Sequence, residues 1–325
     1  MRVRILLSAL LCFRPPLSSD GLTAGTGFLS MYLRNMAGDR LRLMRRAYTL
    51  EDWIMNHSEQ LKYLNDMLLT EMPQYREQAL KFPKDDETQK KLFRSLVNVR
   101  PPMPAEPEFL KVQDLYLQEE IRQKGVTDLK GLTPIQKGIY LWKGDITTLR
   151  CDAIVNAANS QMLGCFVPCH GCIDNAIHTF AGVQLRLACA EIMRKQGYKE
   201  KTGRAKITPA FNLPCRYILH TVGPVVGDRV TPKDEELLAS CYRSCLESAD
   251  RSGVKSIAFC CISTGEFHFP NERAAETAVK TVQDYRQSTQ SKIEVIFNVF
   301  KERDLRIYRN LLRTNQQTET RNGNC

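Results

Sequence analysis

The sequence has 325 residues, of which 43% are hydrophobic, so one large or two ordinary domains can each bury a core. This excludes a chain that is disordered throughout and a collagen-like chain. The formal net charge is +10, but residues 1–46 carry eight arginines against two aspartates and so hold +6 of it. Because a nucleic-acid-binding surface concentrates its basic residues on a folded face, we predict no nucleic-acid partner.

The first 46 residues form a basic leader that we predict to be disordered or to act in targeting. Its early arginines, short apolar run at 5–13, serines and few acids fit a mitochondrial transit peptide, an upstream extension before a start at Met31 or Met36, or a secretory signal. Localisation therefore stays open between the cytoplasm and the mitochondrion. No apolar stretch approaches the roughly 20 residues of a membrane-spanning helix, so we expect no membrane partner.

Residues 47–130 are predicted to be a small helical extension. Apolar residues recur at helical spacing over 48–79, 85–98 and 110–125. Thr49 is the expected cap of the first helix, and Met72-Pro73 should kink or end it. The segment 100–109 contains four prolines, which predict a stiff connector.

From about residue 135 to 314, short strand-like runs alternate with helical stretches, which predicts an α/β domain with a largely buried sheet covered on both faces. Residues 315–325 are predicted to be a disordered tail. The expected strands are 139–144, 153–159, 217–222, 256–262 and 293–300. The expected helices are 174–196, 233–252, 271–286 and 303–314. Ligands of such domains bind at loops beyond the carboxyl ends of the strands.

The chain has 12 cysteines, too few for a disulfide scaffold, and their usage is typical of a reducing compartment. Cys165, Cys169, His170 and Cys172 lie within eight residues of one loop. Because Cys169 and His170 are neighbours that point apart in most backbones, the set Cys165, His170 and Cys172 is the better metal site, with the thiolate and imidazole ligands that Zn²⁺ prefers. Packed thiols beside a surface histidine are the alternative.

Polar residues near these strand ends have two interpretations each. Asp174 can cap the next helix or orient a water beside a metal, and His178 fits a packed residue better than a ligand. Asn156 and Asn159 can support their loop or recognise ligand hydroxyls. Asp145 can cap a helix or accept from an amino group. The loop Ser263-Thr264-Gly265-Glu266-Phe267 has small residues that let backbone amides approach a diphosphate.

The motifs GDIT (144–147), CDAIVNAANS (151–160), HTVGP (220–224) and the glycine loop after SIAFCCI together resemble the macrodomain, an ADP-ribose-binding module. The insertion with Cys165, His170 and Cys172 is similar to the zinc-containing branch of that family, and the resemblance extends over about 135–314. It implies a three-layer α/β/α domain with a mixed, mostly parallel sheet, preceded by the helical segment that this branch carries.

The resemblance also implies roles for individual residues. Asp145 would accept the adenine amino group, and Ile146 would contribute a backbone amide. Asn156 and Asn159 would face the distal ribose, the backbone of 263–267 would hold the diphosphate, and Asp174 with Asn159 would be catalytic. Glu266 departs from the glycine-rich family loop, because it places a carboxylate near a diphosphate.

We therefore expect a monomeric, zinc-dependent hydrolase that removes mono-ADP-ribose from modified protein side chains. An alternative is a non-catalytic ADP-ribose reader in which zinc braces the loop. A redox or zinc-storage protein is a further alternative.

Overall fold

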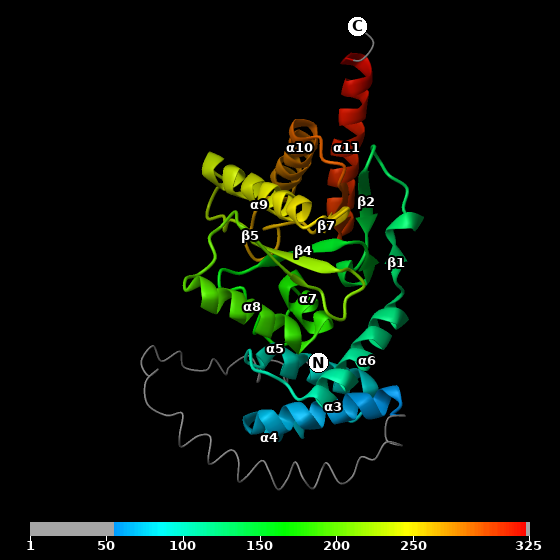
Figure 1. Ribbon diagram of the computed structural model, residues 1–325, viewed down its shortest axis with the longest axis vertical. Helices are drawn as coiled ribbons and strands as arrows, with labels where there is room; N and C mark the ends of the chain where they lie inside the picture. Colours follow the sequence, from blue (N-terminus) through cyan, green and yellow to red (C-terminus); the bar gives the residue numbers. More distant parts are fainter. Residues whose placement is uncertain (1–54, 323–325) are drawn as a thin grey trace.

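The computed structural model describes residues 55–322, and the predicted leader and the proposed Thr49 cap lie outside them. Within these residues no helix is long and apolar enough to cross a membrane. Figure 1 shows a sheet between two layers of helices, with a separate helical unit packed below the lower layer. The three-layer α/β/α fold predicted from the sequence is confirmed.

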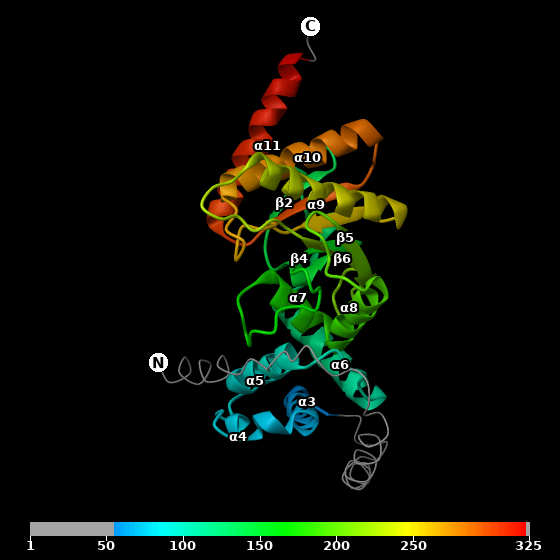
Figure 2. The same ribbon diagram turned by 90° about the vertical axis from the view of Figure 1, so that its left-hand side faces the viewer.

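The helical unit consists of α3 (His57–Glu71), the short η2 (Pro73–Tyr75) and α4 (Arg76–Ala79), α5 (Asp86–Val99) and α6 (Pro107–Lys124). Its helices meet in a second core, which includes Leu64, Leu96 and Tyr116 and is joined by Val183 of the α/β domain. Figure 2 shows the same unit below α7 and α8.

Local signals explain where these helices begin and end. The described start of α3 differs from the predicted helix at 48–79, because Asn56 forms a capping box with Glu59 and the helix begins at His57. The predicted break at Met72-Pro73 is confirmed. The connector ends earlier than expected, since Pro107 opens α6 at a position where a missing amide costs nothing.

The main sheet has the strand order β2-β8-β7-β4-β6-β5, with every pair parallel except β5 and β6. The strands are β2 (Ile139–Lys143), β4 (Ala153–Ala158), β5 (Ala205–Pro209), β6 (Tyr217–Val222), β7 (Ser256–Phe259) and β8 (Glu294–Val299). A separate two-stranded ladder pairs β1 (Thr127–Asp128) with β3 (Leu149–Arg150), beside the short helices η3 (Leu129–Gly131) and η4 (Ile146–Thr148). Sequence patterning missed β5, a short edge strand that ends in Pro209.

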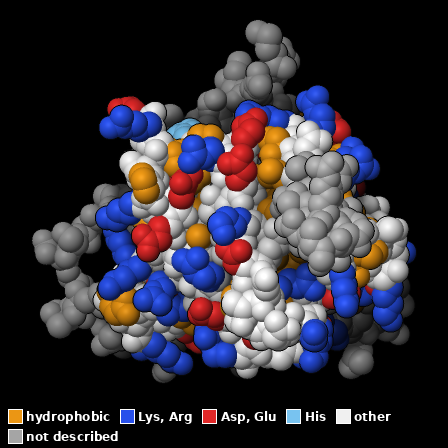
Figure 3. Space-filling model, turned by 90° about the horizontal axis from the view of Figure 1, so that it is seen from above, with side chains coloured by type: hydrophobic (Ala, Val, Ile, Leu, Met, Phe, Trp, Pro, Cys, Tyr) orange, Lys and Arg blue, Asp and Glu red, His pale blue; other side chains and the backbone are white. Residues whose placement is uncertain are grey.

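Two layers of helices cover the sheet (Figure 1). The upper layer contains α9 (Pro232–Arg251), α10 (Asn271–Thr289) and α11 (Glu302–Asn322), and the lower one contains α7 (Ile173–Ala181) and α8 (Val183–Gln196). Seen from above, basic and acidic side chains are interspersed over the molecule (Figure 3). Buried apolar residues of the sheet and both layers form one large core.

Two predicted helices differ in extent. The stretch 174–196 is divided at Gly182, whose φ of 96° belongs to the region that glycine adopts readily. A Cβ there would also lie 2.6 Å from the Gln113 side chain. The last helix continues to Asn322 where a tail was predicted from 315, because no proline or glycine interrupts the sequence before Gly323.

Candidate functional site

The predicted site residues gather at one edge of the sheet. Asp145 follows β2, the cysteine-bearing loop at 159–172 follows β4, and the loop at 263–267 lies beyond β7. Since β2, β4 and β7 run in the same direction in one sheet, their carboxyl ends lie at the same edge. Buried apolar strands thus place these polar loops together, where α/β sheets bind their ligands.

The structure brings the three predicted metal ligands together. One side-chain donor atom each from Cys165, His170 and Cys172 lies within 4.8 Å of the others, and Cys165 Sγ is 3.6 Å from His170 Nδ1. All three side chains are half-buried, so solvent and small molecules can reach them. Two sulfurs and one imidazole at this spacing are a donor set that suits Zn²⁺ and leaves a coordination position open.

The two cysteines of this set differ in their pKa. A hydrogen bond from Cys172, together with the amide of Val167 and the ring of His170, lowers the pKa of Cys165 to about 5. The thiol of Cys172 keeps its proton, because its hydrogen bond to Cys165 and its burial raise its pKa. The deprotonated thiolate is the form that binds metals. Cys169 lies apart from this set, with its sulfur 3.4 Å from the carbonyl oxygen of Lys91.

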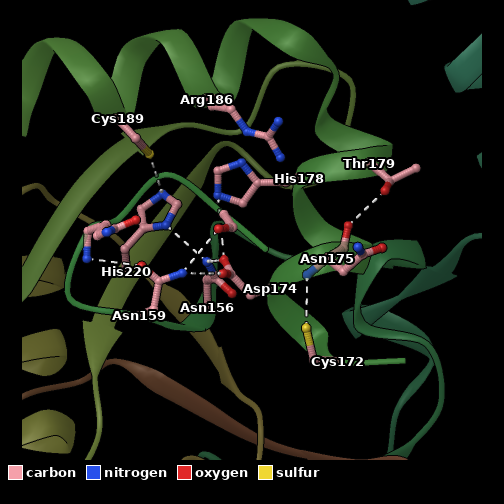
Figure 4. Close-up of polar contacts among 12 residues, drawn as sticks. Asn156, Asn159, Cys172, Asp174, Asn175, His178, Thr179, Arg186, Cys189 and His220 are labelled. Carbon is pink, nitrogen blue, oxygen red and sulfur yellow. Dashed lines mark hydrogen bonds and ion pairs between the residues drawn. The ribbon is translucent and has the colours of Figure 1, made fainter. Parts of the chain in front are cut away.

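Asp174 lies two residues after Cys172, in the first turn of α7, and is 5% exposed. Its Oδ1 accepts a hydrogen bond of 2.8 Å from Asn156, and its Oδ2 lies 3.4 Å from the amide nitrogen of Asn159. Burial and the nearby Cys165 thiolate raise the pKa of Asp174 to about 7, against the lowering effect of the bond from Asn156. Figure 4 shows this carboxylate pointing into a group of buried polar side chains.

The two asparagines lie in different surroundings. Asn159 is half-buried and holds its own loop, because its amide donates to the carbonyl of Gly164 and its carbonyl accepts from the amide of Gln161. Asn156 is fully buried, and its amide contacts both Asp174 and His220 (Figure 4). In this structure Asn156 supports Asp174.

The predicted diphosphate loop packs closely against Gly223, which follows β6. Ser263 has a φ of 65°, and a Cβ on Gly223 would lie 2.0 Å from its Oγ, so only glycine fits at 223. Gly265 and Glu266 are exposed, while Thr264 and Phe267 are half-buried. Glu266 Oε1 is 3.6 Å from His170 Nε2, so this carboxylate lies next to the cysteine-bearing loop at 159–172.

Asp145 and Ile146 lie at the start of η4. One oxygen of Asp145 accepts from the amide and hydroxyl of Thr147, and the other is 3.0 Å from Lys124 Nζ. Burial alone would raise the pKa of Asp145, but these partners lower it. The capping interpretation is therefore realised in this structure, and an adenine amino group would compete with Lys124. Ile146 is buried.

A buried histidine pair was not among the predicted site residues. One side-chain donor atom each from His178, Cys189 and His220 lies within 4.8 Å of the others. These residues come from α7, α8 and β6. His220 contacts Asn156 through Nδ1 and Thr208 through Nε2, and His178 Nε2 is 3.5 Å from Asp174 Oδ1. His220 stands in the HTVGP motif, but its inward direction follows only from the strand register.

Comparison with known proteins places this geometry in context. The family model described as "Macro domain" matches residues 155–278. A Treponema medium protein named protein-ADP-ribose hydrolase is 55% identical over 262 residues, which cover 79% of this chain and 100% of that protein. A protein of the same name from Staphylococcus aureus is 54% identical over 71% of this chain and 87% of its own length.

Solved structures give the same picture. The Oceanobacillus iheyensis macrodomain with ADP matches with a TM-score of 0.52 and 37% identity, over 57% of this chain and 96% of that one. The Trypanosoma brucei macrodomain in complex with ADP-ribose matches with a TM-score of 0.52 and 30% identity, over 67% of this chain and 94% of that one.

Proposed function

This chain belongs to the macro domain family of protein-ADP-ribose hydrolases, and on that premise we propose that it removes mono-ADP-ribose from protein side chains with the help of zinc. The observation that carries the zinc dependence is the half-buried set of Cys165, His170 and Cys172, two residues from a buried carboxylate. An ADP-ribose reader would not need a reachable donor set with an open position beside Asp174.

The chain's own residues have separable tasks in this proposal. Cys165, His170 and Cys172 hold the ion, which when bound supplies a Lewis acid at the distal ribose. Asp174, oriented by Asn156 and Asn159, holds the attacking water and accepts its proton. The water oxygen bonds to C1″ of the ribose, the bond from C1″ to the protein side chain breaks, and that side chain leaves with the proton that Asp174 took from the water.

The remaining loops bind the rest of the nucleotide. The backbone of 263–267 binds the diphosphate, since Gly265 is exposed and the tight contact between Gly223 and Ser263 fixes the entry to this loop. Asp145 and Ile146 bind the adenine. The positioning of the distal ribose by zinc should lower the reaction barrier more than the charge of the ion does, because the two thiolate ligands neutralise that charge.

The test combines metal analysis of the purified chain with release of ADP-ribose from a panel of modified peptides. We expect about one zinc per chain and release from at least one peptide class. Cys172→Ala should lose the metal and the turnover, while ADP-ribose binding measured by calorimetry falls much less. A metal-free Cys172→Ala protein with full activity would exclude the zinc-dependent mechanism. A wild-type chain that binds ADP-ribose but releases none from the modified peptides would be a reader.

A further inference from the structure

Helix α5 of the N-terminal unit lies against the loop at 159–172 of the α/β domain, the metal loop, which carries the three proposed zinc ligands. Arg94, on α5, donates through Nε and Nη2 to Asn175 Oδ1, over 3.0 and 2.7 Å. Its Nη2 also donates to the backbone carbonyl of His170, over 3.0 Å. A guanidinium has a rigid fork of donors, so these contacts fix the loop relative to the helix.

Asn98 lies one turn further along the same face of α5. Its Oδ1 accepts from the backbone amide of Cys169 over 2.9 Å, and its Nδ2 donates to Thr179 of α7. Cys169 has a φ of 53°, an uncommon conformation for a residue with a side chain. Asn98 thus holds the backbone amide of Cys169, and Arg94 holds the backbone carbonyl of His170. Helix α5 therefore holds both ends of the dipeptide 169–170, which carries this metal ligand.

Asn175 extends the connection from Arg94 to a second ligand. Its backbone amide donates to Cys172 Sγ over 3.4 Å, as Figure 4 shows. Its side-chain amide donates to the carbonyl of Val167, which lies between Cys165 and His170 in the loop. The residue that receives two hydrogen bonds from Arg94 is therefore bonded to the loop at two further points.

Helix α5 is itself held on both sides. Leu92, Phe93 and Leu96 are buried in the core of the helical unit. At its C-terminal end, Nη1 of the buried Arg186 donates to the backbone carbonyls of Val97, Asn98 and Arg100. The face with Arg94 and Asn98 is thus fixed between two packed bodies, and a contact to the metal loop from such a helix is rigid.

We propose that Arg94 and Asn98 are positioning residues for the metal site, so that the N-terminal helical unit sets how tightly the loop holds zinc. This inference rests on the proposed zinc site. Groups that hydrogen-bond to the surroundings of metal ligands contribute roughly 10–100-fold to metal affinity, and Arg94 holds the backbone of one ligand and reaches another through Asn175.

The experiment uses the full chain with Arg94→Met, which keeps an unbranched apolar side chain but removes the donors of the guanidinium. Arg122→Met is the matched control, because Arg122 is 75% exposed on α6 and pairs with Glu119 of the same helix. Zinc affinity of the metal-free proteins is measured by competition with a chromogenic chelator. We expect R94M to bind zinc about 10–100-fold more weakly and R122M to bind as the wild type does.

Two further measurements separate positioning from a general loss of structure. Calorimetric ADP-ribose affinity should change by less than about threefold in R94M, since the hydrogen bonds of Arg94 go to His170 and Asn175 rather than to 145–146 or 263–267. Arg94→Lys keeps the charge and one donor group, so it should recover part of the zinc affinity. If R94M does not fold, a folded R94K with weakened zinc binding supports the proposal and one with wild-type zinc binding overturns it.

The outcomes distinguish the two proposals. A wild-type chain that binds no zinc ends the zinc-dependent function and this inference with it. A wild-type chain that binds zinc, together with a folded R94M that binds it equally well, overturns this inference alone and leaves the proposed function in place.

Discussion

Among residues 55–322, two clusters of cysteine and histidine have different properties. Cys165, His170 and Cys172 are half-buried on one loop, whereas His178, Cys189 and His220 are at most 2% exposed and come from two helices and a strand. Contacts within the loop lower the pKa of Cys165 to about 5. Burial raises the pKa of Cys189 to about 12 and lowers that of His220 to about 3.

This difference shows that the residue types alone do not define a metal site. The loop cluster favours a charged thiolate and can be reached from solvent. The buried cluster keeps its side chains neutral, and His220 is held by hydrogen bonds such as the 2.9 Å contact with Thr208. We therefore expect zinc at the first cluster and a packing role for the second.

The largest effect is expected at Asp174, which lies two residues after Cys172 of the first cluster and 3.5 Å from Nε2 of His178 in the second. Asp174→Asn keeps the shape and the buried position but cannot accept a proton, so turnover should fall by about 10²–10⁴-fold. ADP-ribose affinity should stay close to that of the wild type. Asp152→Asn, just before β4 at the opposite edge of the sheet, is the control for ADP-ribose release; equal activities of the two variants would contradict the role of Asp174.

A pair of cysteine substitutions compares the clusters directly. Cys165→Ala should lose zinc and more than about 100-fold of the turnover, since even indirect partners of metal ligands contribute 10–100-fold. Cys189→Ala should keep both, because its thiol is buried at 1% exposure beside His220. Metal analysis and a release assay on both proteins provide the measurement, and zinc loss in Cys189→Ala would reverse the assignment.

His220→Gln tests the packing role of the buried cluster. The variant disturbs hydrogen bonds to Asn156 and Thr208 inside the core, and we expect about 2–3 kcal/mol less free energy of unfolding at pH 7. Chemical denaturation of the zinc-loaded proteins measures this loss, and zinc content should not change. A stable variant without zinc would show that His220 serves the metal.

The smallest expected effect is the pH dependence of the difference in free energy of unfolding between the wild type and His220→Gln. His220 has its pKa lowered from 6.5 to about 3 by burial, so below pH 6.5 only the unfolded chain takes up this proton and the folded state loses stability as the pH falls. For one histidine this amounts to about 2 kcal/mol between pH 7 and 5. The difference between wild type and H220Q should shrink by that amount.

Asp174, whose pKa is raised to about 7, titrates with the opposite sign in both proteins, so the comparison isolates His220. A difference that stays constant from pH 7 to 5 would mean that His220 is charged in the folded state.

The sequence predicted what is local and missed what the fold assembles. Cys165, His170 and Cys172 lie within eight residues, and β4, β6 and β8 are short runs rich in apolar residues, so their places in one loop and in the sheet could be predicted directly. His178 and His220 meet only because α7 packs on β4 and β4 pairs with β6. The contact of Arg94 with Asn175 joins residues 81 positions apart, and no local pattern reports such a distance.

The strand order also has a consequence for synthesis on the ribosome. In the main sheet the first strand, β2, pairs with the last, β8, at Ile139↔Val295 and the four positions that follow. A growing chain therefore carries β2 without its neighbour until almost all later residues have left the exit tunnel, whereas the helical unit has already emerged and can form its core. A nonsense mutation between residues 260 and 293 would remove β8, which leaves β2 without its strand neighbour and makes β7 an open sheet edge, where unrelated strands can add and aggregate.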